Sequence, residues 1–106
     1  MPFLPVARLS DLPDGTLLGV VTPAGERVCL VNVDGEIHAL GNTCTHQEFP
    51  ISDGLLLPGG RIECAWHGAI FDCRTGVARR LPAIDPLPVY AVKVEDGQVL
   101  VGERLR

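Results

Sequence analysis

Four residues in two short segments have the types and spacing of metal ligands. Cys44 and His46 are separated by one residue, Cys64 and His67 by two, and seventeen residues lie between the two pairs. Two thiolates and two imidazoles can bind a [2Fe–2S] cluster in which two His replace two Cys on one iron. Each segment can then give its Cys to one iron and its His to the other. Because imidazole is neutral, such a cluster accepts an electron more easily than one bound by four thiolates.

A structural zinc site is the alternative for the same residues, because zinc also binds two Cys and two His in a closed tetrahedron. Zinc sites, however, usually combine a Cys-x2–4-Cys pair with a His-x3–5-His pair. In this chain each segment mixes one Cys with one His, and one segment has a single intervening residue. The spacing therefore favours an iron–sulfur cluster over zinc.

The sequence around both pairs resembles the Rieske ferredoxin family, the electron carriers of bacterial aromatic-ring-hydroxylating dioxygenases. The likeness lies in the two ligand segments and in the short motifs that follow them. These motifs are Ser52-Asp53-Gly54, residues 59–64, residues 67–72 and Arg74-Thr75-Gly76. The resemblance implies a Rieske fold and one [2Fe–2S] cluster as cofactor, with Cys44, His46, Cys64 and His67 as its ligands.

The resemblance also implies a role without catalysis. A Rieske ferredoxin carries single electrons from an NAD(P)H-dependent flavin reductase to a terminal ring-hydroxylating oxygenase. Apart from the two proposed ligands His46 and His67, the sequence contains one histidine, His38. It therefore cannot build the two-His-one-carboxylate iron site of such an oxygenase. It also has no phosphate-binding glycine fingerprint and no nucleophile motif. We therefore expect a monomeric electron carrier, not an enzyme, with the flavin reductase and the oxygenase as partners.

Two other interpretations stay open at this point. The chain also resembles the small Rieske subunit of assimilatory nitrite reductase, although many of those subunits lack the four ligands that this chain keeps. The second alternative belongs to another class, a zinc-stabilised interaction module without a redox role. Metal content would separate this module from both electron carriers.

High-potential Rieske proteins of respiratory and photosynthetic complexes resemble this chain but differ beside the ligands. They carry an extra Cys in each segment, whereas this chain has Trp66 at one such position and no Cys directly after His46. They also place hydroxyl groups near the cluster, at positions where this chain has Ala69 and Phe71. Hydrogen bonds to cluster sulfurs stabilise the reduced state. Without them we predict a potential near the low end of the Rieske range, about −150 mV.

Length and composition predict one domain over residues 1–106. Hydrophobic residues make up 46% of the chain, which is enough for a packed core. The formal net charge of −4 argues against nucleic acid as a partner. No apolar run is long enough to span a bilayer, and the N-terminus lacks the pattern of a signal peptide. We therefore expect a cytoplasmic protein with no membrane partner, in a compartment where thiols stay reduced.

Apolar residues and turn residues alternate in a way that predicts an all-β fold. The expected strands cover residues 16–21, 26–33, 36–40, 89–94 and 98–101, with tight turns at Asp34-Gly35 and Asp96-Gly97. Residues 10–13 could start one helical turn at most, and no stretch predicts a long amphipathic helix. Antiparallel sheets should form a base, and residues 42–75 should form a small cluster-binding lobe.

For several other residues the sequence predicts a purely structural role or leaves two roles open. Residues 81–86 resemble the proline loop that covers the cluster in this family, but they also fit a simple connector to the last hairpin. Trp66 either helps a partner to dock or shields the cluster. Cys29 and Cys73 are expected to pack as small hydrophobic residues. His38 is expected on the exposed face of a strand, without a functional role.

Overall fold

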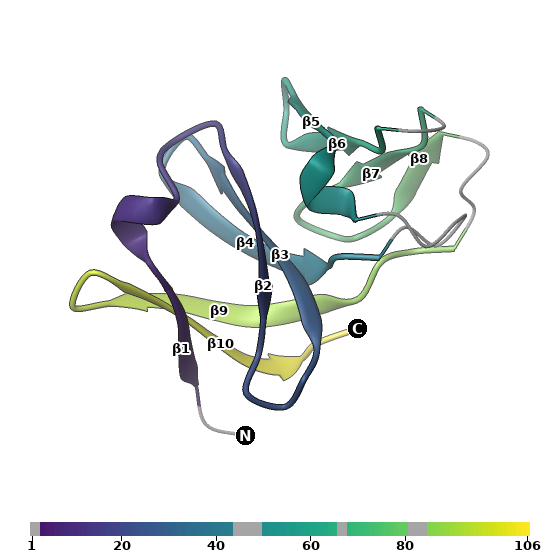
Figure 1. The fold of residues 1–106 in the computed structure, drawn as a ribbon. Coiled ribbons are helices and arrows are strands. Elements are labelled where there is room, and N and C mark those ends of the chain that lie inside the picture. The colour runs from purple at the N-terminus through teal and green to yellow at the C-terminus, as the bar shows by residue number, and fades with distance from the viewer. Residues whose placement is uncertain (1–2, 44–49, 66–67, 81–84) are drawn as a thin grey trace.

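The structure is a computed structural model, and it describes residues 3–43, 50–65, 68–80 and 85–106. Within these ranges the chain forms strands and two 3₁₀ turns (Figure 1). In chain order they are β1 (Leu4–Arg8), η1 (Leu9–Asp11), β2 (Leu17–Val21), β3 (Arg27–Val33), β4 (Glu36–Gly41), η2 (Ile51–Asp53), β5 (Leu55–Leu57), β6 (Arg61–Glu63), β7 (Ile70–Asp72), β8 (Ala78–Arg80), β9 (Val89–Glu95) and β10 (Gln98–Arg104). No helix in the described ranges is long and apolar enough to cross a membrane.

The larger sheet is the base of the molecule. It contains six antiparallel strands in the order β1-β10-β9-β4-β3-β2 (Figure 1). The β3–β4 hairpin turns at Asp34 and Gly35, the β9–β10 hairpin turns at Asp96 and Gly97, and all four residues have positive φ. Two consecutive residues of positive φ form the turn whose twist matches that of the flanking strands. Both predicted hairpins are therefore confirmed.

β3 is buried on both faces, which explains its unbroken apolar run. Val28 and Leu30 belong to one hydrophobic cluster, Cys29 and Val31 belong to another, and all four are fully buried. Because side chains alternate across a strand, β3 separates two cores. One core lies within the base, and the other joins the base to the smaller sheet.

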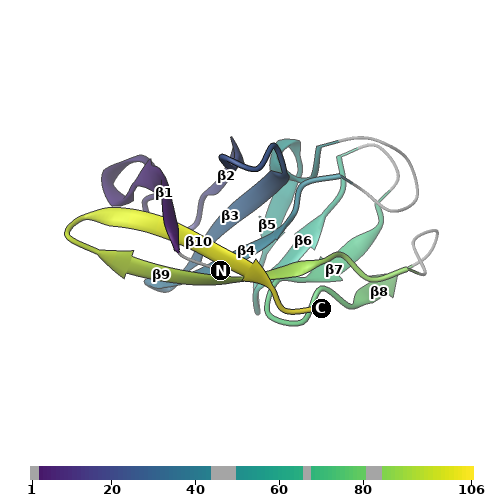
Figure 2. The ribbon, with the colours of Figure 1, turned by 90° about the horizontal axis from the view of Figure 1, so that it is seen from below.

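The smaller sheet forms a lobe at one end of the base (Figures 1 and 2). Its short antiparallel strands lie in the order β5-β6-β7-β8. Ile62 and Phe71 of the lobe pack in the same cluster as Leu40 of the base. The predicted all-β architecture, a base of antiparallel sheet with a small lobe, is confirmed. The lobe sheet runs past the predicted limit at Thr75, because β8 turns back to pair with β7.

β1 is the base strand that the sequence pattern does not predict. It contains Pro5, which has no N–H to donate and interrupts the alternation of apolar and polar residues. The strand lies at the edge of the base and pairs with β10 alone, with a register shift after Pro5. Edge positions tolerate proline in this way. The predicted single helical turn follows directly, as η1.

Candidate metal centre

Cys64 is a predicted ligand that lies within the described part of the chain. It directly follows β6 and is only 1% exposed. Its N–H donates to the carbonyl of Ala69 (2.7 Å), and its carbonyl accepts a hydrogen bond from the N–H of Gly68 (3.3 Å). These bonds lie next to the last pair of the β6–β7 hairpin, Glu63 and Ile70. Cys64 is therefore a buried residue at the end of β6, joined by hydrogen bonds to the residues just before β7.

The ends of the first ligand segment are also paired. Thr43 and Pro50 form an antiparallel bridge. Just outside this bridge, the N–H of Ile51 donates to the carbonyl of Asn42 (2.8 Å). The described residues on either side of the first ligand segment are thus paired with each other.

The other predicted ligands, the aromatic residue beside them and part of the proline-bearing segment lie outside the described residues. They are Cys44, His46, His67, Trp66 and residues 81–84. Their assignments stay predictions. Within the described ranges, no three His, Cys, Asp or Glu residues are grouped so as to hold a metal ion.

The chain just after the first ligand segment lies beside the start of the second, at one end of the small sheet. Leu55 pairs with Glu63, the residue before Cys64. Gly54 lies against the carbonyl of Glu63, so closely that a Cβ at position 54 would overlap it. Ile51, at the end of the first segment, is buried in the same hydrophobic cluster as Cys64. Protein contacts alone therefore hold the end of the first segment against the start of the second.

The surroundings of Cys64 fit a sulfur-bound cluster. Ile51, Ala69 and Phe71 share its hydrophobic cluster and are fully buried. Thiolates are the ligands that iron–sulfur clusters use, and an apolar shell limits solvent access and so influences the potential. Neither Ala69 nor Phe71 carries a hydroxyl. This apolar corner therefore fits a metal cluster that is bound through sulfur.

Cys29 and Cys73 are buried in the same core and are not joined in a disulfide. Burial raises the pKa of Cys29 from its ordinary value of about 9 to about 12, with a further increase from Cys73. Burial also raises the pKa of Cys73 to about 11, although the neighbouring Arg74 opposes this increase. Both side chains pack in the hydrophobic core, and neither belongs to the four proposed ligands. Their predicted role in packing is confirmed.

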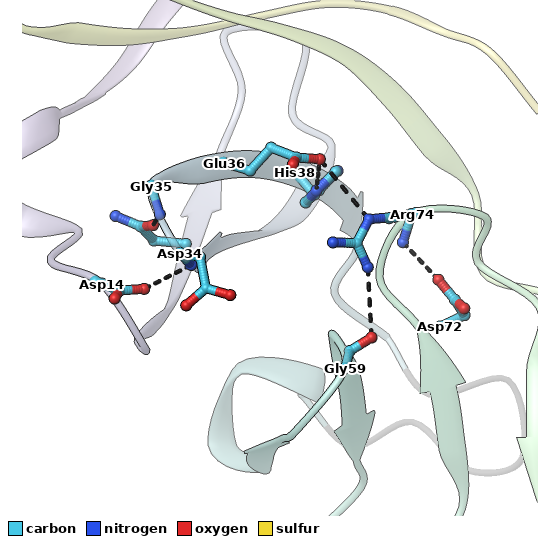
Figure 3. A network of polar contacts seen from close by, with 9 residues as sticks. Asp14, Asp34, Gly35, Glu36, His38, Gly59, Asp72 and Arg74 are labelled. Atoms are coloured by element: carbon cyan, nitrogen blue, oxygen red, sulfur yellow. Dashed lines mark hydrogen bonds and ion pairs between the residues drawn. The ribbon is translucent and has the colours of Figure 1, made fainter.

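A polar network links the lobe to the base (Figure 3). Nε of Arg74, in the lobe, lies 3.7 Å from Oε1 of Glu36 on β4. Nη1 of Arg74 donates to the carbonyl of Gly59 (3.4 Å), and its backbone N–H donates to Oδ1 of Asp72 (2.9 Å). The Glu36 and Arg74 side chains are 61% and 46% exposed, so this ion pair contributes little energy. The hydrophobic core between lobe and base, which contains Leu40, Ile62 and Phe71, is the larger contact between the two parts.

His38 is less exposed than predicted. Its side chain is 18% exposed, and its Nε2 is buried, 3.0 Å from Oε1 of Glu36. His38 pairs with Val31, and directly paired residues of neighbouring strands share a face. That face is the one that the lobe covers. The sequence pattern of the strand shows an available face but cannot show that a distant segment packs against it.

The chain after the proline-bearing segment is fixed to both parts of the molecule. The N–H of Leu87 donates to the carbonyl of Gly76 in the lobe (2.8 Å). The carbonyl of Pro88 accepts a hydrogen bond from the N–H of Gly41 in the base (2.9 Å). Leu87 is buried in the core between base and lobe. These contacts fix residues 87–88 between lobe and base, and both interpretations of residues 81–86 stay predictions.

The fold is similar to solved structures of ferredoxins. A Sphingomonas yanoikuyae B1 ferredoxin has a TM-score of 0.88 and 33% sequence identity, over 96% of this chain and 99% of that chain. A chain in the complex of reduced oxygenase and oxidized ferredoxin in carbazole 1,9a-dioxygenase has a TM-score of 0.84 and 34% identity. That match covers 93% of this chain and 91% of the other.

A nitrite reductase small subunit from Mycobacterium tuberculosis shares the architecture as well. Its TM-score is 0.82, over 94% of this chain and 93% of that chain, but its sequence identity is 23%. At this identity the likeness shows the fold alone. It therefore does not favour the nitrite reductase alternative.

Sequence comparison gives a closer relationship. The family model of the Rieske [2Fe–2S] domain matches residues 3–91. The biphenyl dioxygenase ferredoxin subunit of Pseudomonas sp. (strain KKS102) is 38% identical over 101 residues, which are 95% of this chain and 92% of that protein. The ferredoxin component of the p-cumate 2,3-dioxygenase system of Pseudomonas putida is also 38% identical, over 86% of this chain and 77% of its own length. These relatives are electron-transfer components rather than catalytic subunits. The chain belongs to the Rieske [2Fe–2S] domain family.

Proposed function

We propose that this protein is a ferredoxin that carries single electrons on one [2Fe–2S] cluster. Cys44 and Cys64 bind one iron, and His46 and His67 bind the other. The observation that carries the proposal is the position of Cys64. It is a buried thiol at the base of one ligand loop, and it shares a hydrophobic cluster with Ile51 at the end of the other loop. A cluster with ligands from both loops requires this convergence.

The chain contributes binding, water exclusion and control of the potential. When bound, the cluster supplies reversible one-electron reduction. Ala69 and Phe71 bury apolar surface beside Cys64, which limits the access of water. Because these residues offer no hydroxyl to a cluster sulfur, the reduced state receives no side-chain hydrogen bond from them. We expect a midpoint potential of about −150 mV.

The partners follow from the relatives. Two similar sequences are named as ferredoxins of dioxygenase systems, and one similar chain belongs to a complex of oxygenase and ferredoxin. By analogy, this protein accepts electrons from an NAD(P)H-dependent flavin reductase and passes them to a terminal ring-hydroxylating oxygenase. It acts as a monomer in the cytoplasm, where thiols stay reduced. Its net charge of −4 favours basic contact surfaces on both partners.

Anaerobic stopped-flow mixing tests this proposal. The protein is reduced by one electron with dithionite and mixed with the oxidised terminal oxygenases of the biphenyl and p-cumate systems. We expect the visible spectrum of the carrier to return to its oxidised form, at a rate that rises with oxygenase concentration. If no oxygenase accepts the electron and a nitrite reductase flavoprotein does, the partner class is wrong. Purified protein without iron and sulfide would contradict the electron-carrier function itself.

A further inference from the structure

Asn42 joins the two ends of the first ligand loop to the base. Its N–H donates to the carbonyl of Arg27 on β3 (3.1 Å), and its carbonyl accepts a hydrogen bond from the N–H of Ile51 (2.8 Å). Its side-chain Oδ1 accepts a second bond across the loop, from the N–H of Ser52 (2.8 Å). One residue before the loop thus holds two successive residues after it. The side-chain bond adds a second closure outside the Thr43–Pro50 bridge.

The backbone of β2 packs tightly behind this closure. Gly19 faces the Asn42 and Ser52 side chains, and both of these residues are half-buried. A Cβ at position 19 would lie 2.7 Å from Oγ of Ser52 and 2.9 Å from Nδ2 of Asn42. The φ angle of Gly19 is not positive, so its backbone conformation does not require glycine. The absence of a side chain at position 19 is what makes room for the Asn42 amide.

The closure also reaches the second ligand loop. Ile51, which bonds to the carbonyl of Asn42, is fully buried in the hydrophobic cluster that contains Cys64. Asn42 itself stands two residues before Cys44 in the chain. A shift at Asn42 therefore changes where the first loop starts relative to the ligand at the base of the second.

We propose that Asn42 is a positioning residue for the cluster. Its side-chain amide fixes the closure of the loop that supplies Cys44 and His46, and thereby sets their place relative to Cys64. This inference rests on the proposed function, because it needs a cluster bound by both loops. Asn42 itself binds no metal in this account.

The test compares iron release from variants of the loaded protein. Asn42→Ala removes the acceptor for the Ser52 N–H and leaves the backbone bonds of residue 42 in place. We expect iron to be released to a chelator about threefold to tenfold faster than from the wild type. This is the change in rate that corresponds to the loss of one net hydrogen bond. The g values of the reduced cluster in EPR should also shift, since they depend on ligand positions. Asn42→Asp keeps Oδ1 and should restore slow release.

Asn32→Ala is the matched control. Asn32 is buried and also bonds to the backbone through its side chain, with Nδ2 donating to Leu12 (2.8 Å) and Oδ1 accepting from Gly35 (2.9 Å). It lies near the β3–β4 turn, at the end of this hairpin opposite to Asn42. We expect Asn32→Ala to lower the stability of the fold and to leave the g values and native-state iron release unchanged.

Each result decides the inference. Iron release at the wild-type rate in Asn42→Ala, or equal acceleration in Asn32→Ala, would overturn it. If Asn42→Ala does not fold, Gly19→Ala replaces it, because a methyl group there displaces Ser52 and the amide of Asn42. Unchanged release in Gly19→Ala would overturn the inference as well. Wild-type protein without iron and sulfide would overturn the proposed function together with the inference, whereas a loaded wild type with unchanged variants would overturn the inference alone.

Discussion

Gly54 lies directly against the carbonyl of Glu63, the residue that precedes Cys64. This contact joins the chain just after the first ligand loop to the chain just before the second. Gly54 has a φ of −85°, which any residue adopts, so the close approach and not the backbone conformation requires glycine. The contact fixes how near the two ligand loops can come.

Gly54→Ala should therefore damage both the fold and the site. A methyl group would overlap a backbone carbonyl that belongs to a paired strand. We therefore expect the free energy of unfolding to fall by about 1–3 kcal/mol. Iron content per chain should fall as well. The measurements are urea unfolding and iron analysis of the purified variant.

Gly25→Ala is the control for this prediction. Gly25 has a φ of 84° and open space around its missing Cβ. Alanine there adds backbone strain of about 1–2 kcal/mol without a steric contact, and we expect full iron content. Equal iron loss in both variants would show that general destabilisation, not the Gly54–Glu63 contact, controls loading.

Arg74→Gln tests the ion pair between lobe and base. Because Arg74 and Glu36 are both exposed, we expect the free energy of unfolding to fall by no more than about 1 kcal/mol. The difference from wild type should shrink in about 1 M salt, where the screening length is about 3 Å. Glu95→Gln, which removes the similarly exposed pair with Lys93 on β9 and leaves Lys93 over the Phe3 ring, is the control for the loss of a surface charge. A loss of several kcal/mol for Arg74→Gln would contradict this account.

Alkaline pH should destabilise the protein through three buried groups, one of which is Cys73, whose pKa burial raises to about 11. The pKa of Cys29 is raised to about 12 by burial and by Cys73. The pKa of Tyr90 is also raised to about 12, by burial and by its hydrogen bond to Glu26. A raised pKa means that the folded state favours the protonated form, so this stability is complete below the unfolded values of about 9 and 10. It is lost as the pH rises toward about 12.

Urea unfolding at pH values from 8 to 11 measures this effect. We expect the free energy of unfolding to fall steadily above pH 9. Cys29→Ala should show a smaller fall over the same range, because one of the three groups is gone. Identical pH dependence in the variant and the wild type would mean that Cys29 ionises equally in both states.

The sequence predicts the parts of this fold that depend on neighbouring residues. Asp34-Gly35 and Asp96-Gly97 predict their hairpins because each dipeptide suits a two-residue turn. The four candidate ligands are recognisable because metal binding constrains their types and spacing. The run over residues 28–31 predicts a buried strand.

The remaining features depend on packing between distant segments. β5 to β8 have three residues each, too few to show a clear alternation of apolar and polar residues. The burial of His38 depends on the lobe that covers its face of β4. No sequence pattern indicates that Gly54 meets Glu63, or that Asn42 reaches Ser52 across a loop.

Replacing the proposed ligand His67 by Cys tests the ligand assignment. A thiolate adds negative charge to its iron, so the variant should either fail to assemble a cluster or have a lower midpoint potential. Cys73→Ala is the control, because Cys73 is a buried thiol outside the four proposed ligands. Its EPR signal and potential should match the wild type. An unchanged spectrum and potential in His67→Cys would show that His67 is not a ligand.

An EPR-monitored redox titration of anaerobically purified protein tests the central claim most directly, with iron, zinc and sulfide determined on the same sample. We predict a rhombic Rieske-type signal on reduction, iron and sulfide in equal amounts, and a midpoint potential of about −150 mV. A colourless protein that contains one zinc and gives no signal would contradict the electron-carrier account.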